Sequence, residues 1–212
     1  MDVLERVPEQ LLFQFNKDTD LKQWIVGCDK DIGGQSTAAF ELTAEGKARF
    51  HGNISLSLPL KRKEFVRSGY AAIRSREAHH TLLGSNYWDT GIFRFLCLRV
   101  RGDRRRYMVN LQTDGVIKAD LFQHRLFLRR PGQWENVLIG FRDFTLTHNG
   151  LVLPEQMQMM RESVRTIGFS VMDGQEGPFS LEIDSIKMIN TDGTDGEVDV
   201  QPDGAAKITL TM

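Results

Sequence analysis

The chain lacks the features that mark secreted and membrane-spanning proteins. Among its 212 residues there are only two cysteines, Cys28 and Cys97, which are too few for a disulfide framework and favour a reducing compartment. No apolar run approaches the roughly 20 residues that a membrane-spanning helix needs. The N-terminus, MDVLERVPEQ, has neither the apolar core of a secretion signal nor the Arg- and Ser-rich composition of a transit peptide. The sequence therefore predicts a globular protein that does not cross a membrane by itself.

Motifs of nucleotide-binding proteins and hydrolases are also missing. The stretch GCDKDIGGQST at residues 27–37 is not a phosphate-binding loop, because Gln35 stands where that loop needs a lysine. It is not a nucleophile elbow either, because Ala38 replaces the final glycine of that motif. We expect a tight connection between strands, in which glycines allow positive φ and short polar side chains bond the backbone: Gly33, Gly34, Asp29, Asp31 and Ser36.

No spacing of side chains indicates a metal or catalytic centre. The five histidines include one adjacent pair, His79 and His80, and no zinc motif. A structural calcium ion is considered at Asp184 or near Asp18 and Asp20, against the simpler interpretation that these carboxylates bond turns. No two acids stand out as a glycosidase pair. We therefore predict a protein that is not an enzyme, with no cofactor, no metal and no catalytic residue.

What the sequence does contain is a repeated alternation of apolar and polar residues. In ARFHGNISLSL, residues 48–58, every second side chain is small or apolar, which is typical of a half-buried strand. Comparable runs separated by turn-rich segments occur at 11–15, 37–43, 70–75, 93–100, 107–113, 120–128, 135–141, 166–171, 179–189 and 207–212. About ten strands with almost no crossover helices indicate an antiparallel β-sandwich.

Two short segments predict helices, and the ends of the chain differ from the middle. DTDLKQW at 18–24 and PEQMQMMRESV at 154–164 have the helix pattern. The sandwich domain is expected at 12–189, after an N-terminal lead at 1–11. Residues 190–212 form an Asp- and Gly-rich tail, which could add a terminal strand.

Charge is distributed unevenly along the chain. Residues 61–130 carry 16 basic and 6 acidic side chains, whereas the whole chain has a formal net charge of −1. This basic third predicts a patch for an anionic lipid surface or an acidic partner, composed of Lys61, Arg62, Lys63, Arg104, Arg105, Arg106, Arg129 and Arg130. The alternative is a set of solvated turns whose charges the fold interleaves with acids. Nucleic acid is not expected, because the basic runs lack interleaved aromatics. The RGD within them is expected in a hairpin turn and is discounted as an adhesion signal.

Six segments in a fixed order resemble one known family. They are WIVGCDKDIGGQST (24–37), ARFHGNIS (48–55), RSGYAAIRS (67–75), LCLRVRGDRRRYMVNLQTD (96–114), GQWENVLIGFRDF (132–144) and IGFSVMDGQEGPFSLEIDSIKM (167–188). Together they resemble the complex I intermediate-associated protein 30 family, over about residues 12–189. The absent transit peptide, the three consecutive arginines and the acidic tail are departures from the family pattern.

The resemblance implies an all-β fold, a galactose-binding-like jelly-roll β-sandwich with one or two short helices. It also implies a non-enzymatic assembly factor that binds and stabilises membrane-arm intermediates of mitochondrial respiratory complex I. Such proteins act with other assembly factors in the mitochondrial matrix, peripherally at the inner membrane. The alternative is a carbohydrate-binding module, which would need at least two exposed aromatics on one concave face, from Trp24, Tyr70, Trp88, Tyr107 and Trp134.

Overall fold

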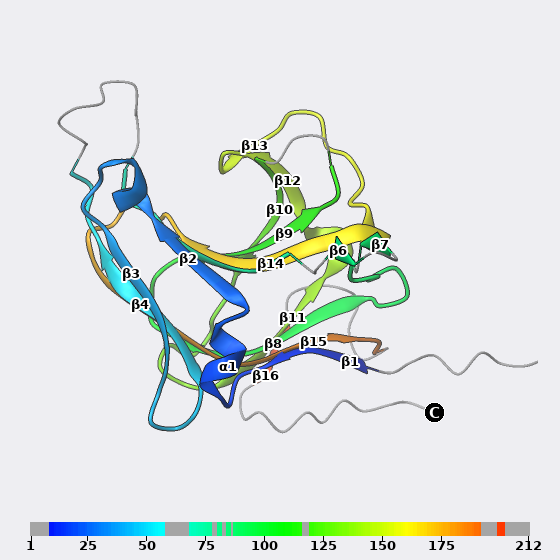
Figure 1. Ribbon diagram of the computed structural model, residues 1–212, viewed down its shortest axis with the longest axis horizontal. Coiled ribbons are helices and arrows are strands. Elements are labelled where there is room, and N and C mark those ends of the chain that lie inside the picture. The colour runs from blue at the N-terminus through cyan, green and yellow to red at the C-terminus, as the bar shows by residue number, and fades with distance from the viewer. Residues whose placement is uncertain are drawn as a thin grey trace, which may run out of the picture.

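The protein is an antiparallel β-sandwich (Figure 1). The computed structural model describes residues 9–57, 68–77, 80–81, 84–85, 87–115, 119–191 and 199–201. Within this part of the chain, two sheets of seven strands each lie face to face, and β6 (His80–Thr81) pairs with β7 (Gly84–Ser85) separately. The all-β sandwich predicted from the alternating pattern is confirmed.

The first sheet, sheet A, has the order β16-β11-β8-β15-β4-β3, and β1 also pairs with β15. Its strands are β1 (Glu9–Gln14), β3 (Thr37–Leu42), β4 (Ala48–Ile54), β8 (Phe95–Gly102), β11 (Glu135–Gly140), β15 (Gly177–Ile189) and β16 (Asp199–Gln201). The strand β15 is long enough to take two partners on one edge. Its first half pairs with β4 and its second half with β1, so the first and last long strands of the sandwich are neighbours.

The second sheet, sheet B, has the order β13-β12-β10-β9-β14-β5-β2 and curves strongly (Figure 1). Its strands are β2 (Trp24–Cys28), β5 (Ala71–Ser75), β9 (Tyr107–Thr113), β10 (Asp120–Leu126), β12 (Thr145–His148), β13 (Leu151–Val152) and β14 (Val164–Val171). Along β9, Tyr107, Val109 and Leu111 are buried, whereas Asn110 and Gln112 are only partly buried. This alternation aims one row of side chains at the core and the other at the concave outer face.

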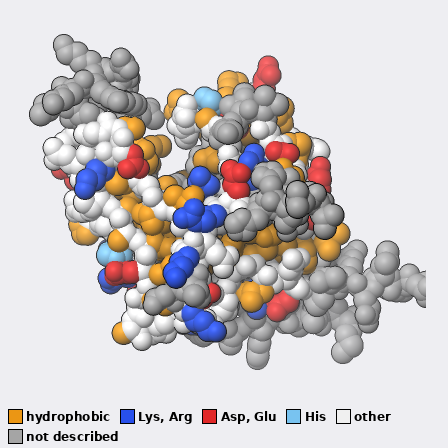
Figure 2. Space-filling model, viewed as in Figure 1, with side chains coloured by type: hydrophobic (Ala, Val, Ile, Leu, Met, Phe, Trp, Pro, Cys, Tyr) orange, Lys and Arg blue, Asp and Glu red, His pale blue; other side chains and the backbone are white. Residues whose placement is uncertain are grey.

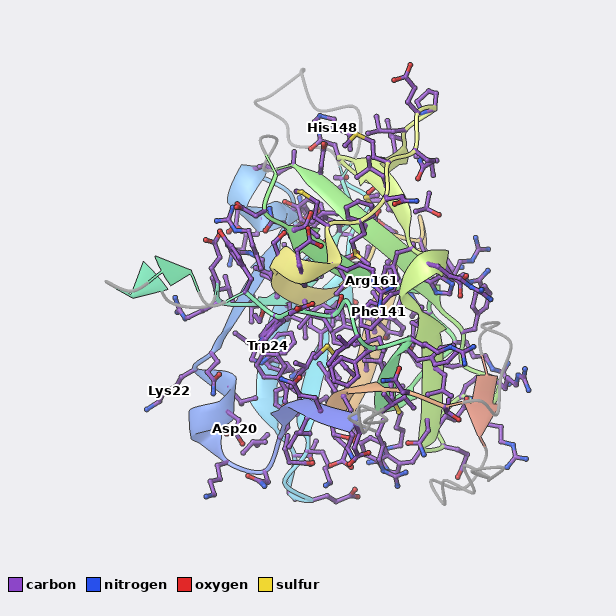
Figure 3. The ribbon with its side chains drawn as sticks, turned by 90° about the vertical axis from the view of Figure 1, so that its right-hand side faces the viewer. Asp20, Lys22, Trp24, Phe141, His148 and Arg161 are labelled. Atoms are coloured by element: carbon purple, nitrogen blue, oxygen red, sulfur yellow. The ribbon has the colours of Figure 1, made fainter. Side chains whose placement is uncertain are left out.

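An aromatic cluster fills the space between the sheets near β1 and β2. Trp24 is 5% exposed and lies inside the sandwich, as Figure 3 shows. Its ring centroid is 5.1 Å from that of Phe13, 5.5 Å from that of Phe15 and 6.4 Å from that of Phe169. These rings come from both sheets, so their contacts join the two layers in addition to burying apolar area.

One of the two predicted helices is present in shortened form. The helix α1 spans Asp18–Leu21 and not 18–24, because Trp24 belongs to β2 and packs in the core. The Asp20 carboxylate accepts hydrogen bonds from the backbone N–H groups of Asn16 and Lys17, at 3.1 and 3.0 Å. The strand β2 itself was missed by the sequence analysis.

The predicted helix at 154–164 is wrong, apart from a single 3-10 turn, η3, at Arg161–Ser163. The side chain of Gln156 accepts the N–H of Leu146 at 2.7 Å and donates to its C=O at 3.0 Å, as a neighbouring strand would. Further on, the Arg161 guanidinium donates to the backbone oxygen of Thr90 at 2.6 Å. Helix propensity is outweighed here by these tertiary bonds.

The RGD segment is not in a hairpin, which corrects the expectation from sequence. The strand β8 belongs to sheet A and β9 to sheet B, so residues 103–106 cross from one sheet to the other. Two further 3-10 turns, η1 (Asp29–Ile32) and η2 (Phe141–Asp143), lie in other connections.

The C-terminal tail is described only in part. The strand β16 pairs with β11, with Val200 opposite Val137. The expected terminal strand at 207–212 and most of the Asp- and Gly-rich stretch lie outside the described residues. No helix within the described ranges is long and apolar enough to span a bilayer.

Candidate functional site

The connections β8–β9 and β10–β11 meet at one end of the sandwich. Tyr107, at the start of β9, pairs with Leu126 at the end of β10. The N–H of Gly132 donates to the C=O of Gly102 at 2.8 Å, which ties the second connection to the end of β8. The arginines of both connections are therefore brought to the same end.

The structure separates the predicted patch residues into two groups. Arg104, Arg106, Arg129 and Arg130 are exposed at this end of the sandwich. Arg105 points inward: its side chain is 9% exposed and pairs with Asp173, whose side chain is fully buried. The remaining predicted members, Lys61, Arg62 and Lys63, lie outside the described residues.

Arg105 links the β8–β9 connection to the β14–β15 connection, and we call its ion pair with Asp173 the clasp. Its Nε and Nη2 donate to the two carboxylate oxygens of Asp173 at 2.8 and 2.7 Å, a bidentate pair. The same guanidinium donates to the backbone oxygens of Gln175, Gly177 and Pro178, at 2.6, 3.2 and 3.2 Å. It holds this turn in place and has no outward-facing group to offer a surface patch.

The acid of the RGD tripeptide is turned inward. Asp103 accepts the N–H groups of Arg105 and Ser180, at 2.9 and 2.7 Å, and the hydroxyl of Tyr107 at 3.0 Å. Because the Asp103 carboxylate already accepts these hydrogen bonds within the protein, it is not available to a receptor that would recognise the tripeptide.

The acid of the second connection is occupied in the same way. Glu135 is fully buried and accepts the backbone N–H of Arg129 at 3.0 Å. Asp103 and Glu135, two of the carboxylates at this end of the sandwich, therefore serve backbone and hydroxyl donors. They do not neutralise the exposed guanidinium groups of Arg104 and Arg106.

Two residues that the sequence analysis missed complete this region. Phe127 is 43% exposed just after β10, and the Arg125 guanidinium lies 4.7 Å from the centre of its ring. The segment FLRR, an exposed aromatic close before two arginines, is the sequence signal that could have identified it. We call the exposed group the arginine surface: Arg104, Arg106, Arg125, Phe127, Arg129 and Arg130.

The GCDKDIGGQST segment turns a corner, as the sequence predicted. Asp29 is fully buried and accepts the N–H and the hydroxyl of Ser36, at 2.9 and 3.0 Å, and the N–H of Gly69. A Cβ on Gly34 would lie 2.4 Å from the Asp29 side chain, so a larger residue would displace this carboxylate. Gly33 follows η1 with a φ of 95°, which glycine adopts without strain.

The outer face of sheet A carries acids and bases in contact. Asp184 lies beside Lys47, is 3.2 Å from Arg99, and accepts a hydrogen bond from Gln14 at 2.9 Å. Two cations already neutralise this carboxylate, so a calcium ion at Asp184 does not fit the arrangement. The described residues contain no group of three or more His, Cys, Asp or Glu side chains that could hold a metal ion.

Neither cysteine is exposed as a reactive thiol. Cys28 is buried and its Sγ donates to the backbone oxygen of Ser36 at 3.3 Å. Cys97 is partly buried, and burial raises the pKa of its thiol to about 11. A thiol with this pKa is almost fully protonated at neutral pH and is therefore a poor nucleophile.

The concave face of sheet B forms an open groove of about 800 Å³. Figure 2 shows the molecule hollowed between the part that carries β2 and η1 and the part that carries β12 and β13. Side chains from five strands and the turn after β12 line the groove, including Ile25, Gly27, Ala72, Arg74, Asn110, Gln112, Leu121, Gln123, Asn149, Gly150, Thr166, Gly168, Ser170 and Met172.

Hydrogen bonds connect polar side chains across the groove floor. The Asn110 amide donates to the Ser170 hydroxyl at 3.0 Å, and the Gln123 amide donates to the Asn110 oxygen at 2.6 Å. The Thr147 hydroxyl donates to the Gln123 oxygen at 2.9 Å. We call this row the polar ladder: Ser170, Asn110, Gln123 and Thr147. It crosses four neighbouring strands, β14, β9, β10 and β12, and strand pairing rather than sequence spacing brings it together.

The aromatics that a sugar-binding face would need are not gathered in this groove. Trp24 and Tyr107 are buried in the core. Trp134 lies on the outer face of sheet A, where its ring contacts arginines of β8. Trp88 bridges to β14 and packs against the core. Of the five aromatics considered from sequence, Tyr70 alone lines the groove in the described part of the chain.

Comparison with known sequences gives a consistent set of relatives. The model of the family described as "Complex I intermediate-associated protein 30 (CIA30)" matches residues 13–183. The relative from Neurospora crassa, named "Complex I intermediate-associated protein 30, mitochondrial", is 39% identical over 200 residues. The match covers 84% of this chain and 72% of the relative. The Drosophila melanogaster and Mus musculus proteins are 35% and 34% identical, and this chain spans 61% and 55% of their lengths.

Comparison with solved structures concerns the fold alone. A family 11 carbohydrate-binding module from Clostridium thermocellum, solved with a β-1,3-1,4-mixed-linked tetrasaccharide, superposes with a TM-score of 0.57. It is 14% identical, and the match covers 87% of this chain and 96% of the module. Part of an agarase, AgWH50C, superposes with a TM-score of 0.51 at 12% identity, over 86% of this chain and 25% of the agarase.

Proposed function

Because the chain belongs to the complex I intermediate-associated protein 30 family, we propose that it acts as a non-enzymatic assembly factor for mitochondrial respiratory complex I. In this role it binds and stabilises membrane-arm intermediates, together with other assembly factors, on the matrix side of the inner membrane. The observation that carries the proposal is the family match over residues 13–183, which includes all of sheet B and most of sheet A. Relatives named as mitochondrial support the compartment.

The chemistry of the described residues supports a binding role. The buried carboxylates of Asp29 and Glu135 accept backbone N–H groups and so serve the fold. Catalytic acids and bases, by contrast, face a cleft with perturbed pKa values. The exposed features are surfaces, namely the arginine surface and the groove of sheet B.

Native-gel complexome profiling tests the assembly role. The chain, with a mitochondrial targeting sequence added, is expressed in mitochondria that lack their own family member. We expect it to co-migrate with partial complex I assemblies and to be absent from the finished enzyme. Migration only at its own mass, with complex I still deficient, would contradict the proposal.

The arginine surface is the part that we assign to the anionic inner-membrane surface. Each Lys or Arg near such a surface contributes roughly 1 kcal/mol. Phe127 lies beside Arg125 and is 43% exposed, and its apolar ring is of the kind that is buried at the boundary between headgroups and acyl chains. Asp173 is paired with Arg105, and Asp103 and Glu135 accept inward-facing N–H groups, so none of these acids is paired with Arg104 or Arg106.

Co-flotation with cardiolipin-containing liposomes tests this assignment. The double variant Arg104→Glu/Arg106→Glu should float far less than the wild-type protein. A matched control, Arg74→Glu/Arg76→Glu, makes the same charge change on β5 and the residue after it, away from the arginine surface. Equal flotation of both variants with the wild type would remove the lipid role. It would leave the assembly role to the complexome result.

A carbohydrate-binding role is the second candidate, and the groove of sheet B is the observation that favours it. The groove is concave and presents hydrogen-bonding side chains, as sugar sites do. Tyr70 offers a single aromatic ring there, whereas stacking along an oligosaccharide uses several. A glycan array probed with the wild-type protein and with Asn110→Asp distinguishes this candidate, because a sugar held in the groove should be lost in the variant.

A further inference from the structure

The polar ladder leaves hydrogen-bond donors facing the groove. The Asn110 and Gln123 side chains each carry an NH₂ group with two N–H donors. One donor of each is used within the ladder, by Ser170 and by Asn110 respectively. No described residue accepts the second donor of either group. The ladder thus fixes the orientation of both amides and leaves one N–H of each without a described partner, on the partly buried Asn110 and on Gln123, which is 9% exposed in the groove lining.

At Gly168 the groove floor beside the ladder carries no side chain. Gly168 lies between Asn110 and Arg74 in the strand register, and Gly27 lies opposite Ala72. A Cβ on Gly168 would sit 2.4 Å from the backbone oxygen of Ile73, so this position requires glycine. A ligand can therefore approach the backbone of β14 closely, next to the amide donors.

One charged side chain of the groove has no acidic partner among the described residues. Arg74 is exposed and lies in the row Ile25–Arg74–Gly168–Asn110–Gln123, in the outward-facing register. Its only hydrogen bond in the described part of the chain is a long one, 3.5 Å, to the backbone oxygen of Ser75. The nearby acid Glu77 is held by Arg165 at 2.5 Å. Glu77 also lines the groove, and the exposed Asp31 carboxylate lies near Gly27. Among the described residues neither acid is paired with Arg74, so the Arg74 guanidinium is available to a carboxylate of a ligand.

We propose that the groove of sheet B binds an extended polypeptide segment that carries an acidic side chain. Side-chain amides match the donors and acceptors of a peptide backbone. Same-side groups of an extended chain repeat at about 6.8 Å, which is also the spacing of residues two apart on one strand, such as Asn110 and Gln112. The carboxylate of the segment pairs with Arg74, and its apolar side chains contact the apolar lining of the groove: Ile25, Leu121 and Met172.

The charge and the scarcity of aromatics favour a peptide over a neutral sugar. A guanidinium without a carboxylate partner gains a charge-assisted hydrogen bond from a carboxylate and less from a hydroxyl. This site is distinct from the arginine surface, and its occupation goes beyond the assembly role argued above.

NMR titration of the ¹⁵N-labelled full chain tests the proposal with defined probes. The probes are acetylated and amidated decapeptides of alternating threonine and valine, each with one central residue: aspartate, asparagine or lysine. A fourth probe is the β-1,3-1,4-mixed-linked glucan tetrasaccharide. We expect the aspartate peptide to shift the side-chain NH₂ signals of Asn110 and Gln123 and the Nε–H signal of Arg74. The lysine peptide should bind at least about tenfold more weakly, because a like charge replaces the ion pair.

Two variants locate the binding. Arg74→Glu should weaken the aspartate peptide at least about tenfold and strengthen the lysine peptide. Asn110→Asp keeps the size of the side chain, and its oxygens can still bond Gln123 and the Ser170 hydroxyl, but it removes the donor that faces the groove. It should also weaken peptide binding. The control, Arg104→Glu on the arginine surface, should leave peptide binding unchanged.

Three outcomes would overturn the proposal. The first is that none of the peptides shifts the groove signals at millimolar concentration. The second is that the aspartate and lysine peptides bind equally. The third is that the tetrasaccharide shifts the same signals when no peptide does, which would assign the groove to carbohydrate. None of these results depends on the liposome or complexome experiments, so each proposal can fail alone.

Discussion

The arginines on the outer face of sheet A and those of the arginine surface differ in whether their guanidinium groups have carboxylate partners. On the outer face of sheet A, Arg49 lies 2.7 Å from Glu41 and Arg101 lies 2.6 Å from Glu182. On the arginine surface, Arg104 and Arg106 have no carboxylate partner for their guanidinium groups among the described residues. Sheet pairing places an acid beside each arginine in the first region, whereas backbone donors occupy the acids in the second. Partner geometry, and not the number of charges, decides which surface is available for binding.

The same contrast occurs within one run of three arginines. Arg104 and Arg106 are exposed, while Arg105 between them is directed into the protein. The chain bends at Arg104 and Arg105 where it crosses between the sheets, and the bend turns the central side chain towards Asp173 while its neighbours face solvent. The run therefore combines one structural residue with two that are available for binding.

Replacing Arg105 should have the largest effect on stability. We expect Arg105→Met to lower the free energy of unfolding by about 3–5 kcal/mol, because it leaves the buried Asp173 carboxylate without its cationic partner. Arg104→Met, the matched control in the same run, should change it by less than about 0.5 kcal/mol. Urea denaturation followed by tryptophan fluorescence measures both values. Equal losses in the two variants would contradict the distinction between inward and outward arginines.

Acid should weaken the same clasp. Burial alone would raise the pKa of Asp173, but the Arg105 guanidinium and the N–H groups of Arg106 and Gln175 bring that pKa below its usual value. The stabilisation is therefore complete above the pKa of an unfolded aspartate, about 3.9, and is lost as pH falls through the lower pKa of the folded protein.

The pH dependence can be isolated with Asp173→Asn. We expect the difference in unfolding free energy between the wild type and this variant to be constant from about pH 7 to about 4.5 and to shrink below about 3.9. Urea denaturation at stepped pH values gives both curves. Parallel curves down to the acid limit would show that Asp173 keeps an ordinary pKa and that the clasp is not charge-dependent.

The fold was predictable because apolar and polar residues alternate along the half-buried strands. Runs such as ARFHGNI and YMVNLQT aim apolar residues at one core, and the structure confirms the sandwich. The helix expected at 154–164 failed because Gln156 bonds the edge of β12 instead of the local backbone. That contact joins segments that a local pattern does not relate.

The candidate sites were less predictable for the same reason. The basic run at 104–106 was visible in the sequence, but the inward direction of Arg105 depends on Asp173, which lies 68 residues further on. The polar ladder was missed because its members alternate with core residues on separate strands, where each resembles ordinary outward-facing polarity. Only the pairing of β14, β9, β10 and β12 brings them into one row.

The smallest expected effect concerns the paired arginines of sheet A. The Arg101 guanidinium contacts Glu182 and lies 4.9 Å from the ring centre of Trp134, and its side chain is 27% exposed. A double-mutant cycle with Arg101→Ala and Glu182→Ala should give a coupling free energy of about 0.5–1 kcal/mol, as for a partly exposed ion pair. The coupling should fall in about 1 M salt, where the screening length is about 3 Å. A cycle between Arg104 and Glu182, which are not in contact, provides the control and should give a value near zero. If the Arg101 pair also gave zero, the acids of sheet A would not restrain their arginines, and this face would be as available to an anionic partner as the arginine surface.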